Sequence, residues 1–174
     1  MNSSPARPKT RRLIVLGSLA ILWSTLGFGC GGGQDVTPEA IEQAKRLWKE
    51  AGIRDYELEL DWTTGPDHSH YIVSVKDGEV RQIESALTDG RRIELHPGSP
   101  RYFSVDGLFL TIADELALRK SDRPFDQPPG TKVVMRFKAD PKLGYPLWYR
   151  RDVLGTSQSI SIDVIKLVPT SSKG

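Results

Sequence analysis

The sequence predicts an α+β fold, with an antiparallel sheet of about six to seven strands and two helices packed on one face. Two segments carry apolar residues at helical spacing, and the segments between and after them read as strands separated by turn residues. The order is helix, three or four strands, helix, three strands, without the alternation that a parallel sheet requires. Residues 37–169 are therefore expected to form a single domain.

The first helix is expected to begin after Thr37 and to end at Gly52. Thr37 is a suitable N-cap, and Pro38 suits the first helical position, where a missing N–H costs nothing. Gly52 can take the left-handed conformation that ends many helices. The apolar residues of this segment recur at helical spacing: Ile41, Ala44, Leu47, Trp48 and Ala51.

The strands that follow show alternating patterns. Residues 55–62 place Tyr56, Leu58, Leu60 and Trp62 on one face, which predicts a half-buried strand. The opposite face is acidic: Asp55, Glu57, Glu59 and Asp61. Strands are also expected at 71–76 and 79–87, joined by the two-residue turn Asp77-Gly78, and at 91–95 after a second turn.

The second half repeats this order, as a pseudo-repeat would. Ser104 can cap a helix that ends near Arg119 and Lys120, where basic residues suit the negative helix end. A Pro-rich surface loop is expected at 121–130. Strands are expected at 132–138, 147–153 and 158–168, and residues 170–174 are expected to form a frayed tail.

Residues 1–29 have the parts of a lipoprotein-type signal peptide. A basic segment is followed by an apolar run over 13–29, and Cys30, the chain's single cysteine, comes directly after it. The run is longer than a usual signal core and slightly short of a spanning helix, so an uncleaved anchor is the alternative. Both readings place the residues after Cys30 outside the cytoplasm, because the basic flank stays inside.

The segment Leu26–Cys30 resembles a bacterial lipobox, in which a peptidase cuts before the cysteine and the cysteine carries diacylglycerol and palmitate. The usual leucine is displaced to Leu26, and Phe28 is bulky for its place, so a free thiol is a further alternative. Residues 30–36, which begin with Gly31–Gly33, are expected to form a flexible tether. The expected location is the cell membrane or outer membrane, facing the periplasm or the exterior.

The charge balance argues against a nucleic-acid partner. The chain has 24 Lys and Arg against 22 Asp and Glu, but four of the basic residues and none of the acids precede Cys30. The mature part therefore has two more acids than bases, and the basicity belongs to the signal. Without a further cysteine, the mature domain must fold by burial rather than through disulfides.

Four motifs carry a resemblance to a known family. They are Trp48…Gly52-Ile53…Tyr56, Tyr71-x-Val73-x-Val75-x-Asp77-Gly78, Ser104–Phe109 and Asp140-Pro141-x-Leu143-Gly144-Tyr145-Pro146. With them the chain resembles a bacterial family of small secreted domains and lipoproteins of unknown function. The resemblance implies an exported α+β domain and no known reaction. Some members have a cysteine pair where this chain has Asp61–Thr64.

Six residues are candidates for an interaction site: Asp140, Gly144, Tyr145, Pro146, Trp148 and Arg150. The first four belong to the last motif, which reads either as a hairpin that sets strand register or as a ligand-facing loop. Trp148 to Arg151 mixes aromatic and cationic residues, as a surface for lipid headgroups or an anionic glycan would. The alternative is an ordinary strand, with Trp148 and Tyr149 on opposite faces and the arginines extending at its edge.

No metal and no cofactor are expected. His68, His70 and His96 offer three nitrogens, but their spacing is a weak signal for a metal site, and they also read as solvated loop histidines. The acidic face of residues 55–61 lacks the pattern of a calcium loop and reads as a solvated strand face.

The sequence has no nucleophile elbow, phosphate-binding loop or zincin helix. The leading hypothesis is therefore a lipid-anchored envelope domain that binds an envelope protein or a small ligand without catalysis. The alternatives are an exported enzyme with a scattered active site and a structural or assembly factor of the envelope.

Overall fold

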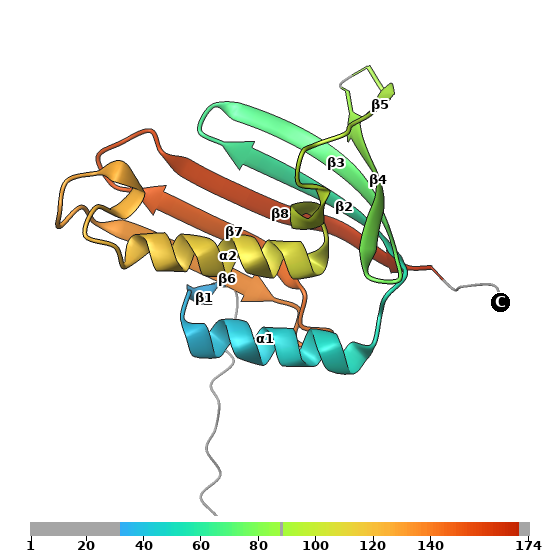
Figure 1. Ribbon diagram of the computed structural model, residues 1–174, viewed down its shortest axis with the longest axis horizontal. Helices are drawn as coiled ribbons and strands as arrows, with labels where there is room; N and C mark the ends of the chain where they lie inside the picture. The colour runs from blue at the N-terminus through green and yellow to red at the C-terminus, as the bar shows by residue number, and fades with distance from the viewer. Residues whose placement is uncertain (1–31, 88, 171–174) are drawn as a thin grey trace, which may run out of the picture. The chain divides into compact units, whose positions relative to one another are not determined.

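A computed structural model describes residues 32–87 and 89–170, which form one antiparallel sheet with two helices on one face (Figure 1). The predicted α+β class is confirmed. The described residues contain eight strands, slightly more than expected, in the order β1-β6-β7-β8-β2-β3-β4-β5. All neighbouring strands in this order pair antiparallel.

The elements follow the chain closely. They are β1 (Gln34–Asp35), α1 (Pro38–Ala51), β2 (Tyr56–Thr64), β3 (Asp67–Lys76), β4 (Glu79–Ala86), β5 (Arg92–Glu94), the 3-10 turn η1 (Pro100–Phe103), α2 (Val105–Arg119), the 3-10 turn η2 (Pro124–Asp126), β6 (Val133–Ala139), β7 (Pro146–Val153) and β8 (Ser159–Pro169).

Both helices begin at the residues that the sequence indicates. The Thr37 hydroxyl accepts a hydrogen bond from the Ala40 N–H at the start of α1, and Gly52 ends α1 with a φ of 64°. The Ser104 hydroxyl accepts from the Gly107 N–H at the start of α2. These caps satisfy backbone donors that the helices leave without a partner.

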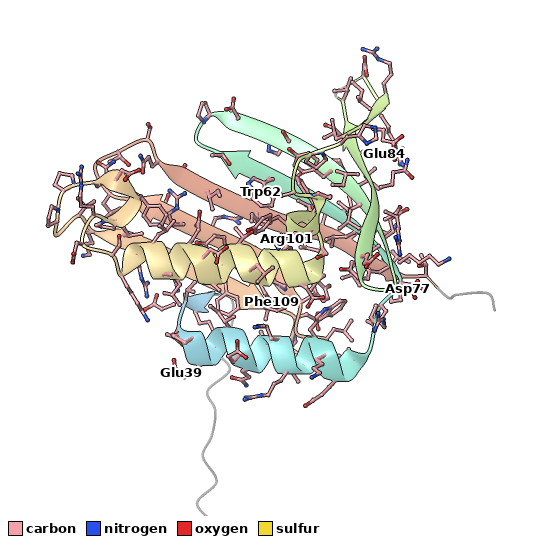
Figure 2. All side chains as sticks on the ribbon, viewed as in Figure 1. Glu39, Trp62, Asp77, Glu84, Arg101 and Phe109 are labelled. Carbon is pink, nitrogen blue, oxygen red and sulfur yellow. The ribbon has the colours of Figure 1, made fainter. Side chains whose placement is uncertain are left out.

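The hydrophobic core lies between the sheet and the two helices. Phe109 and Ile112 of α2 and Trp48 of α1 are buried against strand residues such as Leu58 and Phe137 (Figure 2). The Trp48 and Tyr56 rings meet edge to face, with centroids 5.5 Å apart. The Tyr56 hydroxyl also accepts from the Val105 N–H at 3.0 Å, so one core residue of β2 connects both helices to the sheet.

The two halves of the domain are arranged in the same way. A helix followed by a three-stranded meander occurs twice, as α1 with β2–β4 and as α2 with β6–β8. The meanders join edge to edge through β8 and β2, which pair from Tyr56↔Pro169 to Thr64↔Ile160. The last strand of the chain therefore lies in the middle of the sheet.

The structure differs from the expected flexible tether over residues 30–36. Gln34 and Asp35 form β1 on the edge of β6, and Val36 is fully buried. The Val36 N–H donates to the Met135 carbonyl at 3.1 Å. Strand pairing and core burial fix these residues, a long-range effect that their glycine-rich neighbours conceal.

The strand boundaries differ from expectation at β3. Because Thr64 pairs with Asp67, β3 begins at Asp67, and His68 and His70 lie on the strand rather than in a loop. At the other end of the chain, the Thr170 N–H donates to the Asp55 carbonyl. The predicted signal peptide, Cys30 and residues 171–174 of the predicted tail lie outside the described residues. In the described part, no helix is long and apolar enough to cross a membrane.

Candidate functional site

The six candidate interaction residues lie in two different places. Asp140, Gly144, Tyr145 and Pro146 belong to the β6–β7 hairpin, which packs on α1, while Trp148 and Arg150 lie on the opposite face of the sheet. That opposite face, which α1 and α2 do not cover, is called the open face below (Figure 1). The structure therefore does not gather the six residues into one site.

The β6–β7 hairpin has a well-defined structural role. The Asp140 carboxylate accepts from the backbone N–H groups of Lys142 and Leu143, at 2.9 and 2.7 Å, and holds the turn. Gly144 has a φ of 82°, and a Cβ there would overlap the backbone of α1. Tyr145 packs against Trp48, and burial, together with the nearby Asp140 charge, raises the pKa of Tyr145. These contacts favour the hairpin reading over a ligand-facing loop.

Trp148 and Arg150 belong to the first polar cluster of the open face. The Arg150 guanidinium forms an ion pair of 2.6 Å with Asp163 on β8 and lies 5.4 Å from the centroid of the Trp148 ring. It also donates to the carbonyls of Tyr149 and Ile162. The Ser161 hydroxyl donates to the other oxygen of Asp163. The arginine is thus held in one orientation while its side chain stays partly exposed.

The second polar cluster lies beside it, on β2 and β3. The two ring nitrogens of His70 each face a carboxylate, with Nδ1 2.7 Å from Asp61 and Nε2 3.1 Å from Glu59. Asp61 lies opposite Asp163 in the strand register, so the two clusters are neighbours. His68 contacts Thr63, with 3.1 Å between Nδ1 and Oγ1. The alternating acids that the sequence shows on this strand therefore have histidine and arginine partners on the adjacent strands.

A hydroxyl, an imidazole and a carboxylate do follow one another here, as Thr63, His68 and Asp61. The arrangement is unsuited to nucleophilic catalysis. The 3.9 Å between His68 Nε2 and Asp61 exceeds hydrogen-bond distance, and the His68 side chain is 59% exposed. Neither of the two most prominent clefts of the described chain is lined by these residues, so nothing in the two clefts shields them from water.

The three histidines do not form the metal site considered above. His68 and His70 share β3, whereas His96 follows β5. In residues 32–87 and 89–170, no group of three or more His, Cys, Asp or Glu side chains is placed to hold a metal ion.

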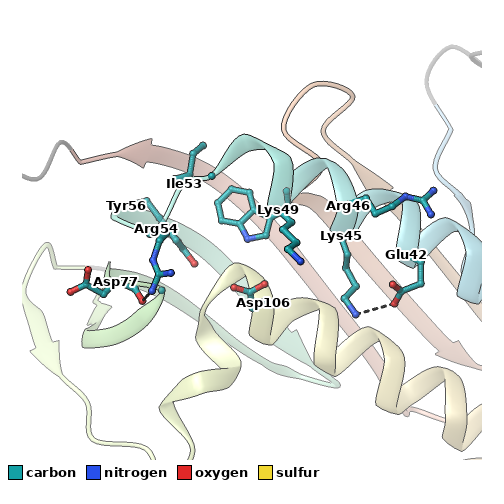
Figure 3. A pocket seen from close by; sticks show the side chains of 12 residues that line it. Glu42, Lys45, Arg46, Lys49, Ile53, Arg54, Tyr56, Asp77 and Asp106 are labelled. Carbon is teal, nitrogen blue, oxygen red and sulfur yellow. Dashed lines mark hydrogen bonds and ion pairs between the residues drawn. The ribbon is translucent and has the colours of Figure 1, made fainter.

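A cleft of about 660 Å³ opens between α1, the β3–β4 turn and the start of α2 (Figure 3). Trp48 and Tyr56 are among its lining residues, and Lys45, Lys49 and Arg54 extend around it. Lys45 is paired with Glu42 at 2.9 Å, and the Arg54 guanidinium donates to the Asp77 carbonyl at 2.7 Å. Sequence reasoning missed this cleft, because its walls come from four separate segments.

Burial raises the pKa of Tyr56, which lines this cleft, to about 12. The hydrogen bond from Val105 opposes that rise, and the charge of Asp106 adds to it. A neutral phenol at this position is a structural hydrogen-bond acceptor rather than an acid–base group at neutral pH.

A buried polar network on the helix side was also missed. Arg151 and Glu115 form an ion pair of 3.2 Å, with side chains 9% and 12% exposed, and the Tyr149 hydroxyl donates to Glu115. The sequence pattern places both arginines at the edge of a strand. Arg151 instead shares the buried face with Tyr149, because the side chains of β7 on this side are held by α2.

The comparisons with known proteins add no relative. No family model matches the chain, and no curated protein matches it. The family resemblance of its motifs therefore remains a prediction.

Proposed function

We propose that this protein is a lipid-anchored domain of the bacterial cell envelope that binds another envelope protein through its open face, without catalysing a reaction. The observation that carries the proposal is the pair of adjacent polar clusters, in which Arg150, Asp163, His70, Asp61 and Glu59 are held in fixed orientations. Groups that are already ordered lose little further entropy when a partner binds.

The composition of the open face fits a protein partner. Arginine and tryptophan are enriched at protein interfaces, and here Trp148 and Arg150 lie together beside an acidic strand. Strand addition at a sheet edge is a less suitable mode, because the edge strands β1 and β5 have only two and three residues. Binding through side chains of the open face is therefore favoured over pairing with the backbone of an edge strand.

The lipid anchor rests on Cys30 and its position after the apolar segment. Mass spectrometry of the mature N-terminus tests it directly. We expect a chain that begins at Cys30 and carries acyl groups, and the Cys30→Ser variant should lose the lipid and leave the membrane fraction. An intact Met1 with an unmodified Cys30 would contradict the anchor.

The binding role is tested by crosslinking and pull-down from native membranes. We expect the wild-type protein to recover a defined envelope protein and the Arg150→Glu variant to lose it, because the reversed charge repels Asp163 and disrupts the cluster. The matched control is Arg91→Glu, since Arg91 forms an exposed ion pair with Asp89 far along the chain. Equal recovery by both variants would contradict the role of the open face.

A small-ligand role is the second candidate, and the cleft beside α1 favours it. Lys49 and Arg54 are cationic and stand over aromatic residues, an arrangement that suits a small anionic ligand with an apolar part. Thermal-shift titration with organic phosphates and carboxylates tests this, with Lys49→Glu as the variant. Stabilisation that Lys49→Glu abolishes would support the cleft.

A further inference from the structure

Gly33 marks the point at which the domain fixes the chain that arrives from Cys30. Gly33 is buried, and a Cβ there would overlap the Trp148 ring and the Phe137 carbonyl. The Arg136 guanidinium donates to the Gly33 carbonyl at 2.5 Å. The chain is therefore already bound to the edge of the sheet at Gly33, one residue before β1 begins.

The distance from this point to Cys30 is limited by covalent geometry. Three peptide units separate Cys30 from Gly33, and each spans at most about 3.6 Å, which gives a reach of about 11 Å. The headgroup layer of one leaflet is itself roughly 5–8 Å thick. A lipid on Cys30 that is inserted in the leaflet therefore holds Gly33 at, or immediately above, the headgroups.

The side chains around Gly33 suit such a position. Trp148 lies against the Gly33 backbone, and its indole has the apolar body and polar N–H that favour the membrane interface. Arg136 and Lys138 of β6 are exposed beside it and can contact anionic headgroups. Asp35, opposite Arg136 in the register, reduces the net charge of this edge without reversing it.

We infer that the β1–β6 edge, at Trp148, Arg136 and Lys138, rests on the anionic lipid headgroups of the leaflet that holds Cys30. This inference rests on the proposed lipidation. The strand order then becomes a height order, with β1 at the membrane and β5 furthest from it. The seven strand spacings between them place β5 roughly 33 Å higher, and the acidic cluster of β2 and β3 stands clear of the surface.

The test uses the intact lipoprotein, reconstituted in vesicles of phosphatidylglycerol and brominated phosphatidylcholine, whose bromine atoms quench nearby indoles. We expect quenching of the wild type and loss of that quenching in Trp148→Phe. Trp62 on β2 and Trp48 in the core remain in this variant as indoles away from the edge. Quenching that persists in Trp148→Phe would overturn the orientation.

Two further variants separate the short tether from the charges. A long Gly-Ser insertion between Gly31 and Gly32 should reduce the quenching, because the mean reach of a flexible linker grows with its length. In that variant, added Arg136→Gln and Lys138→Gln changes should reduce the quenching further, and high salt should have the same effect as the two changes. Quenching that none of these changes reduces would contradict headgroup contact.

The outcome for the lipid is read independently, by vesicle flotation and by the mass of the N-terminal peptide. A protein that carries the lipid and floats, but whose Trp148 is not quenched, overturns the orientation and leaves the proposed function intact. A protein without lipid on Cys30 overturns both.

Discussion

The hydroxyl group of Tyr149 donates a 2.6 Å hydrogen bond to the Glu115 carboxylate, which also holds Arg151 in a buried ion pair. The Arg151 guanidinium lies 4.3 Å from the centroid of the Phe125 ring, in a segment where Phe125 has a φ of 52°. Burial, and then the Glu115 charge, raise the pKa of Tyr149. This network joins β7 to α2 and to the η2 turn.

Removing Glu115 should therefore be costly. Glu115→Ala leaves the Arg151 charge buried and without its carboxylate, which typically costs about 3–5 kcal/mol of unfolding free energy. Urea unfolding of the purified domain measures it. The matched control is Glu42→Ala, which breaks the exposed Lys45–Glu42 pair and should cost about 0.5 kcal/mol or less. Similar losses in the two variants would show that the buried pair is not a special contributor.

Gly144 and Gly155 offer a second matched pair. Both have a φ of 82°, but a Cβ at Gly144 would overlap α1, whereas a Cβ at Gly155 meets open space. Gly155→Ala should cost about 1–2 kcal/mol for the left-handed backbone. Gly144→Ala should cost about 1–3 kcal/mol more, because the hairpin must move away from α1. Urea unfolding of both variants checks this, and equal costs would mean that the hairpin does not pack as described.

Stability should fall in alkaline solution between pH 10 and 12. Unfolded Tyr56 loses its proton near the ordinary tyrosine pKa of 10.0, whereas folded Tyr56 keeps it up to a pKa of about 12. The folded state binds more protons in this window, so its contribution is complete below pH 10 and is lost as pH rises toward 12. The expected loss from this group is about 2–3 kcal/mol.

The control for that prediction is Tyr56→Phe. This variant leaves the Val105 N–H without its acceptor and should be less stable by about 1–3 kcal/mol at neutral pH. Its stability should decline less than that of the wild type between pH 10 and 12, by chemical denaturation at each pH. A parallel decline in both proteins would assign the alkaline loss to other groups.

Zinc, copper and nickel ions should leave the melting temperature unchanged. His68 and His70 each lie near carboxylates, but the described residues form no set of three ligands. A differential scanning measurement with and without each ion checks this. A rise in melting temperature that His70→Gln abolishes would instead identify an open-face metal site.

Local sequence patterns were sufficient for the helices and most strands. Thr37, Gly52 and Ser104 are end signals that act within one helical turn, and the structure shows each of them in that role. The Asp77-Gly78 turn is equally local, with φ values of 56° and 79°. For these elements, the residues that determine the structure are close together in the sequence.

Long-range contacts account for what the sequence did not reveal. β1 has two residues, too few for a periodic pattern, and it forms only because β6 offers an edge. The burial of Arg151 depends on Glu115, which belongs to α2. His68 and His70 follow a Gly-Pro turn signal that is compatible with a loop, and pairing with β2 makes them strand residues. The cleft and the open-face clusters likewise combine side chains from several segments.

The central position of β8 has a consequence for the timing of folding. The sheet cannot close between β7 and β2 until Ser159–Pro169, the last strand of the chain, is available. Synthesis proceeds from the N-terminus, so the nascent chain lacks this strand until its final residues are made. If the chain is exported as proposed, it remains unable to complete its native sheet during synthesis, which keeps it threadable through a secretion channel.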